Sequence, residues 1–190
     1  LDDFGDAVAV VDGDQAAIGL ESTVVWAAGN EMDNEMDNGA GNEWRVLRPG
    51  VIGADEIGDV AGVVVAGVSR QKDNEAPISP GTKYRHYSPK ARVLWLDMNQ
   101  IEATYIASEQ PRLFVVTHTE ERRRQIQTLT QKNLSMLHQH AESLDELAVH
   151  LYAWYREADQ HNTDTIFVEQ FESATALAIS LHNRISKTIE

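Results

Sequence analysis

The sequence has no cysteine among its 190 residues, which excludes disulfide bonds, thiolate metal ligands and a cysteine nucleophile. No apolar run approaches the ~20 residues that cross a bilayer, and the first residues lack the basic and apolar regions of a signal peptide. Basic residues are scarce: 16 Lys and Arg stand against 30 Asp and Glu, a net charge of −14. A broad nucleic-acid surface needs the opposite balance, so any site for a polyanion is small and local.

The Walker P-loop, the G-x-G-x-x-G dinucleotide motif and the G-x-S-x-G nucleophile motif are also absent. What is present divides into two parts. Up to about residue 70, short β-branched runs such as GLESTVVWA and WRVLRPG end at Gly or Pro, which is typical of strands ending in turns. We expect three or four strands there, with little helix to cover them.

From Arg92 onward, apolar runs alternate with helical stretches. The runs RVLWLD, RLFVVTH, NLSML and TIFVEQF predict strands, and NQIEATYIASEQ, EERRRQIQTL and ATALAISLHNRISKTIE predict helices. A further helix begins at Ser143, which has capping-box spacing to Glu146. This alternation indicates βαβ units, a parallel sheet with helices on both faces, and an α/β fold with a Rossmann-like layer sandwich.

Two segments contain metal-ligand residue types without forming a ligand set. The tandem repeat in GNEMDNEMDNGAGNE predicts an exposed insertion between two hairpin strands; as a calcium loop it lacks the D-x-[DN]-x-[DN]-G spacing. His138 and His140 have no evident third ligand and are interpreted as exposed loop residues. We therefore predict no metal site formed by this chain alone.

Polar residues beside two of the early strands are the first candidates for a site. Glu21, Ser22 and Thr23 precede an apolar strand, where they either hold a polar small molecule or only satisfy a turn. Arg48 ends a strand just before a Pro-Gly turn, so its guanidinium is placed either to bind phosphate or carboxylate or to pair with a nearby acid.

The segment PISPGTKYRHYSPK, residues 77–90, holds three of the five prolines and separates the two parts. In extended conformation Lys83, Arg85 and Tyr87 share one side, and Tyr84 and His86 share the other. The prolines stiffen the segment and lower the entropic cost of ordering it. It is either a tether or a cationic, aromatic lid over a site.

In this order, the elements VVDGD, GLESTVV, RVLRPG and ISPGTKYRHYSPKA resemble the two-domain threonylcarbamoyl-AMP synthases. The helix AISLHNRISKTIE is similar to that family's closing A-x-x-N-R-[LI] helix. The resemblance implies that residues 1–70 are the C-terminal part of a YrdC-like catalytic domain with an incomplete twisted sheet. Residues 71–91 are then the linker, and residues 92–190 the Rossmann-like C-terminal domain.

The resemblance also implies a reaction and its site. The family condenses L-threonine, bicarbonate and ATP, with Mg²⁺ expected on the nucleotide, into threonylcarbamoyl-AMP and pyrophosphate. It implies a cytoplasmic enzyme without direct tRNA or membrane binding, whose product a separate tRNA-modifying complex uses. The residues implied for threonine binding are Ser22 and Thr23, and those for ATP binding are Arg48, Lys83, Arg85, His86 and Tyr87.

The departures from the family pattern set limits on this expectation. Asp14 replaces a glycine of the family's DGG turn, and Trp26 stands where the family usually has Asp. The family's K-x-R and S-x-N catalytic elements belong to an N-terminal half that precedes these motifs, so we expect a fragment that is inactive alone. Two alternatives stay open: a non-catalytic ligand-binding or regulatory module, and one half of a split synthase.

Overall fold

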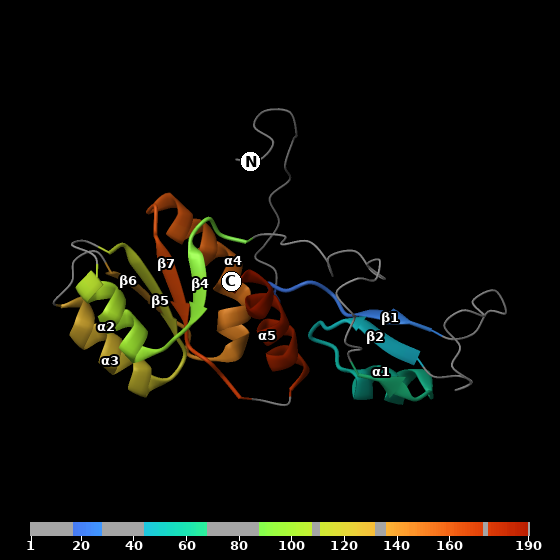
Figure 1. Cartoon of the computed structure of the whole chain (residues 1–190). Helices are drawn as coiled ribbons and strands as arrows, with labels where there is room; N and C mark the ends of the chain where they lie inside the picture. The colour runs from blue at the N-terminus through green and yellow to red at the C-terminus, as the bar shows by residue number, and fades with distance from the viewer. Residues whose placement is uncertain are drawn as a thin grey trace.

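The computed structural model describes residues 17–27, 44–67, 88–107, 111–131, 136–172 and 175–189, and contains two β-sheets (Figure 1). The VVDGD element, with its Asp14, and the tandem NEMD repeat lie outside these ranges. Among the helices that the structure describes, none has the length and apolar character needed to cross a membrane.

The larger sheet has four parallel strands in the order β4-β7-β5-β6, each pair being parallel. Four helices follow its strands in the chain. This arrangement confirms the predicted α/β fold with a helix-covered parallel sheet. The strands are β4 (Arg92–Trp95), β5 (Leu113–Thr117), β6 (Met136–His140) and β7 (Thr165–Val168), and the helices are α2 (Met98–Ala107), α3 (Glu120–Thr130), α4 (Leu144–Gln160) and α5 (Ala176–Thr188).

Alternation along the strands explains how helices cover both faces of this sheet. Successive side chains of a strand point to opposite faces, and the core divides accordingly into two buried clusters. Leu113 and Val115 of β5 pack with Ile101 of α2 and Ile126 of α3. The alternate residues of β5, Phe114 and Val116, face α4 and α5, which Figure 1 shows on the other side of the sheet. This second cluster includes Phe114, Val116, Leu147, Leu151, Leu181 and Ile185.

Strand β6 corrects the sequence prediction for the two histidines. The predicted strand NLSML overlaps the first two residues of β6, Met136 and Leu137, and β6 continues through His138 and His140, paired with β5. The histidines are therefore strand residues and not loop residues. Thr117 Oγ1 lies 2.8 Å from Nε2 of His138 and 2.9 Å from Nδ1 of His140. The polar pattern HQH belongs to an edge strand, and this polarity is why the strand was not predicted there. Gln139, between the two histidines, points to the opposite face and donates to Glu157.

We predict that the half-buried His138 makes the protein less stable in acid. Burial first, then His140 and Arg123, lower the pKa of His138 from 6.5 to about 4. The unfolded chain therefore binds a proton at His138 more tightly than the folded protein does. The contribution of His138 to the free energy of unfolding is fully retained above pH 6.5 and decreases as the pH falls toward 4. We expect His138→Gln to lose less thermal stability between pH 6.5 and 4 than the wild type. The exposed His161→Gln should keep the wild-type slope; equal slopes for all three proteins would contradict this.

Glu169, directly after β7, fills the N-terminus of α3. Its buried carboxylate accepts from the amides of His118 and Thr119, at 2.7 and 3.0 Å, and from the Thr119 hydroxyl. Ser143 is the N-cap of α4, where the sequence predicted the helix to begin. Its hydroxyl accepts from the Glu146 amide at 3.2 Å. The carboxylate of Glu146 accepts from the Glu142 amide. Acidic side chains thus stabilise both helix starts.

The smaller sheet has the order β1-β2-β3, with β1 (Val24–Trp26) antiparallel to β2 (Trp44–Arg48) and β3 (Val65–Ala66) parallel to it. Helix α1 (Ala54–Ala61), which the sequence analysis did not predict, precedes β3 and buries none of its residues. Its Val60 is 92% exposed. Among the described residues, the smaller sheet therefore has little helical cover of its own, and its motif segments contact the larger unit.

Candidate functional site

The GLEST segment, Gly19 to Thr23, is held at successive positions by different parts of the molecule. A Cβ on Gly19 would lie 2.3 Å from the backbone oxygen of Ala148, so only glycine allows this approach to α4. Leu20 packs against the core cluster on the α4 and α5 face. The start of the segment is thus seated on the larger α/β unit.

Glu21 continues this attachment through its carboxylate. Its Oε2 accepts from Nε of Arg184 at 2.8 Å and from the Tyr152 hydroxyl at 3.2 Å. Arg184 is 7% exposed and Glu21 26%, so water screens the pair weakly. Burial, followed by the negative charge of Glu21, raises the pKa of Tyr152 well above its usual range, which keeps its hydroxyl a donor. Glu21 is therefore bound by both α4 and α5.

Ser22 and Thr23 turn instead toward the smaller sheet. Arg48 donates from Nε to the Ser22 carbonyl at 3.1 Å and from a terminal nitrogen to Ser22 Oγ at 3.2 Å. The Thr23 hydroxyl donates to the Ile52 carbonyl at 2.7 Å. The structure thus brings Ser22 and Thr23, from one predicted motif, together with the segment that carries Arg48, from the other. The Thr23 hydroxyl is bonded to the segment that follows β2, whereas Ser22 is exposed beside a guanidinium.

The R-P-G turn after β2 is attached to α5, the helix whose Arg184 also binds Glu21. Ser180 of α5 donates to the Pro49 carbonyl at 3.2 Å in a buried contact. One turn earlier on α5, Cβ of Ala176 approaches within 3.2 Å of the position a Cβ would take on Gly53. Ala176, Ser180 and Arg184 are spaced four residues apart and so share one face of the helix. We call these three residues the α5 stripe; it contacts both motif segments.

The partners that the larger unit supplies were not predicted from the sequence. Tyr152 and Ser180 had no signal in the sequence. Arg184 had one, because it is the arginine of the A-x-x-N-R-[LI] resemblance, but its partner Glu21 lies 163 positions earlier and no local pattern joins them. Long-range pairs of this kind become visible only when the fold brings the elements together.

Positive charge gathers around these motifs although the chain as a whole is acidic. Burial first, then Arg184, with Arg48 adding, lowers the pKa of Lys187, while Glu21 opposes the shift. Three cations therefore share a neighbourhood with one carboxylate. A grouping of cations of this kind favours a small anionic ligand.

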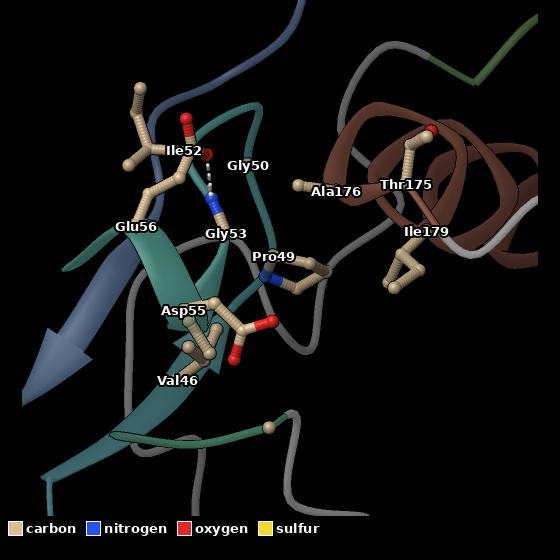
Figure 2. Close-up of a pocket in the computed structure, with 12 residues that line it drawn as sticks. Val46, Pro49, Gly50, Ile52, Gly53, Asp55, Glu56, Thr175, Ala176 and Ile179 are labelled. Atoms are coloured by element: carbon tan, nitrogen blue, oxygen red, sulfur yellow. Dashed lines mark hydrogen bonds between the residues drawn. The ribbon is translucent and has the colours of Figure 1, made fainter. Parts of the chain in front are cut away.

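A cavity of about 350 Å³ opens next to this region, between the β2–α1 connection and the start of α5 (Figure 2). Gly50 lines the cavity and also abuts Thr23. Figure 2 shows Thr175, Ala176 and Ile179 facing Pro49 and Gly53 across it, with Glu56 accepting from the Gly53 amide at 2.9 Å. Much of its wall is apolar, and Asp55 and Glu56 supply the charge.

The other predicted residues of the site belong to the linker segment. Lys83, Arg85, His86 and Tyr87, and with them most of the predicted linker, lie outside the described residues. Within the described ranges, no group of three or more His, Asp or Glu side chains is arranged to hold a metal ion.

Similarity to known proteins identifies the family to which the chain belongs. The profile of the family "Threonylcarbamoyl-AMP synthase, C-terminal domain" matches residues 52–188. The chain belongs to this family. The match includes the whole larger unit and α5 with its stripe, so the helix that holds the two motif segments is a family element.

Relatives of this family extend the similarity to the GLEST segment. The threonylcarbamoyl-AMP synthase of Bacillus subtilis is 29% identical over 187 residues, covering 96% of this chain and 49% of the relative. That of Schizosaccharomyces pombe is 29% identical over 195 residues, covering 94% and 44%. The chain thus spans about half the length of these synthases.

A solved structure supports the fold. The crystal structure of P. abyssi Sua5 complexed with L-threonine is similar with a TM-score of 0.59 at 24% identity, covering 97% of this chain and 50% of that one. A second P. abyssi Sua5 structure gives a TM-score of 0.53 at 23% identity. Both support an arrangement of elements that continues from the smaller sheet into the larger unit.

Proposed function

We propose that this chain forms part of an L-threonylcarbamoyladenylate synthase. The reaction condenses L-threonine, bicarbonate and ATP into threonylcarbamoyl-AMP with release of pyrophosphate, and its product serves tRNA threonylcarbamoyladenosine modification in the cytoplasm. The observation that carries the proposal is the contact between Arg48 and Ser22, two motif residues 26 positions apart that meet near two further cations, Arg184 and Lys187.

Each residue has a defined part in this proposal. Ser22 and Thr23 border the threonine, and Arg48 binds the nucleotide phosphates. In the reaction a carbamate oxygen attacks the α-phosphorus, and pyrophosphate leaves. Such displacements depend on positioning and charge neutralisation. A guanidinium held by the Ser22 carbonyl is already oriented before the substrate arrives, so less free energy is spent on ordering it.

Mg²⁺ is compatible with the described side chains only as an ion that comes with the nucleotide. Mg²⁺ commonly keeps several waters and binds through substrate phosphates and one or two carboxylates. It would neutralise phosphate charge, and Arg48 would add a fixed cation beside it. We further propose residues 71–91 as the linker whose Lys83, Arg85, His86 and Tyr87 close over the nucleotide, between a partial YrdC-like domain and the Rossmann-like domain.

The proposal is tested by pyrophosphate release from ATP, L-threonine and bicarbonate. The chain is assayed alone and combined with a polypeptide that supplies the K-x-R and S-x-N elements. We expect no turnover alone, and turnover in the combination that requires all three substrates. Arg48→Ala should raise the half-saturating ATP concentration about tenfold or more, since a charge-assisted hydrogen bond contributes about 1.5–3 kcal/mol.

Arg92→Ala is the matched control, because Arg92 is exposed at the start of β4 and should leave ATP saturation unchanged. Equal ATP saturation for Arg48→Ala and wild type would remove Arg48 from the site. Absence of turnover in every combination, together with retained small-molecule binding, would favour a non-catalytic ligand-binding module instead.

A further inference from the structure

The α5 stripe contacts both motif segments of the proposed substrate site, although it belongs to the other unit of the structure. Arg184 binds Glu21 of the GLEST segment, and Ser180 binds the Pro49 carbonyl of the R-P-G turn. The two contacts are one helical turn apart on α5. The two segments they hold are those that carry Ser22 and Arg48.

Glu21 is the residue through which this attachment reaches the site. It is adjacent to Ser22 in the chain, and its carboxylate has two donors, Arg184 Nε and the Tyr152 hydroxyl, from two different helices. Ser22 itself is exposed, and its carbonyl and its hydroxyl both accept hydrogen bonds from Arg48. An exposed residue between two anchored neighbours is oriented by those neighbours, so the backbone at Ser22 follows the position of Glu21.

We propose that Glu21 and Arg184 are positioning residues, through which the C-terminal α/β unit holds Ser22 and Thr23 in the geometry that binds L-threonine. Neither side chain needs to touch the substrate. The inference rests on the proposed function for the identity of the ligand, whereas the mechanical link between α5 and the GLEST segment stands on the structure. The C-terminal unit is then a structural part of the substrate site.

Backbone hydrogen exchange tests the mechanical link in the chain itself, without any substrate. In Glu21→Gln and Arg184→Gln we expect amides 22–26 to exchange about tenfold faster than in wild type, because each change leaves the remaining partner without its opposite charge. Amides of β5 and β7, in the core of the larger sheet, should keep their protection. Arg124→Gln is the matched control, since Arg124 pairs with Glu120 on the exposed face of α3.

Glu21→Gln keeps the experiment interpretable if Arg184→Gln unfolds, because Glu21 lies on a strand-start segment and not within the core. Tyr152→Phe removes only one of the two donors to Glu21 and should give a smaller increase in exchange than Glu21→Gln. Unchanged exchange of amides 22–26 in Glu21→Gln would overturn the link.

Steady-state kinetics of the combined enzyme tests the positioning role. We expect Glu21→Gln to raise KM for L-threonine about tenfold and to change kcat less than about threefold, because the reacting groups are untouched while ground-state binding weakens. Faster exchange with an unchanged KM for threonine would overturn the positioning role. If no combination has synthase activity, the exchange result alone still decides the link, so failure of the proposed function is distinguishable from failure of this inference.

Discussion

Gly50→Ala is expected to displace the Ser22–Thr23 backbone and to abolish most of the synthase activity. A Cβ at this position would lie 2.2 Å from the Thr23 amide nitrogen and 2.7 Å from the Ser22 carbonyl carbon. Both are backbone atoms of the segment that Arg48 binds, so the clash cannot be relieved by rotating a side chain. Overpacking of this kind costs about 1–3 kcal/mol, and we expect the upper end of that range.

Gly67→Ala is the matched control for this substitution. Gly67 also lines the cavity of Figure 2, but an added Cβ would meet no atom within 4 Å. Its free energy of unfolding should stay within about 0.5 kcal/mol of wild type. The measurement is denaturant unfolding followed by threonine-dependent pyrophosphate release. Wild-type activity in Gly50→Ala would show that the contact between the two motifs is not needed.

Glu169→Ala is expected to destabilise the larger unit by about 3 kcal/mol, since each buried donor left without a partner costs about 1–3 kcal/mol. The carboxylate serves the His118 and Thr119 amides and the Thr119 hydroxyl, and Glu169 is 7% exposed. In a unit of about a hundred residues, 1 kcal/mol shifts the thermal midpoint by about 4–8 °C. The midpoint should therefore fall by more than 10 °C.

Glu172→Ala provides the comparison, because Glu172 is an exposed carboxylate three residues later. It should change the midpoint by less than about 2 °C, as most exposed substitutions do. A small shift for Glu169→Ala would mean that water or another group can satisfy the donors at the start of α3.

The larger unit was predictable because its local signals agree with its packing. The apolar runs of β5 and β7 are almost wholly buried, and those of β4 are buried or half-buried after the exposed Arg92, so each strand reads as a continuous hydrophobic run. The prediction of the edge strand β6 missed its second half, because an edge position tolerates three successive polar side chains, those of His138, Gln139 and His140. Helix α1 was missed for a different reason: it is only eight residues long, and Gly53, Gly58 and Gly62 stand before, within and after it, a pattern that indicates turns.

The site was predictable only as separate pieces. Ser22 and Arg48 could be selected because hydroxyl and guanidinium groups at strand ends suit an anionic ligand, and the structure does join them. Their support by Ser180 and Arg184 was not predictable, since those contacts cross more than a hundred residues of chain. The predicted lid, residues 83–87, stays a prediction.

The most direct test of the central claim is the identity of the product. The chain, combined with the polypeptide that carries the K-x-R and S-x-N elements, is incubated with ATP, L-threonine and ¹³C-bicarbonate, and the nucleotides are analysed by mass spectrometry. We predict ¹³C-labelled threonylcarbamoyl-AMP with the wild-type chain, and little or none when the chain is omitted or carries Gly50→Ala. Equal amounts of the labelled product without the chain would contradict its assignment as part of the synthase.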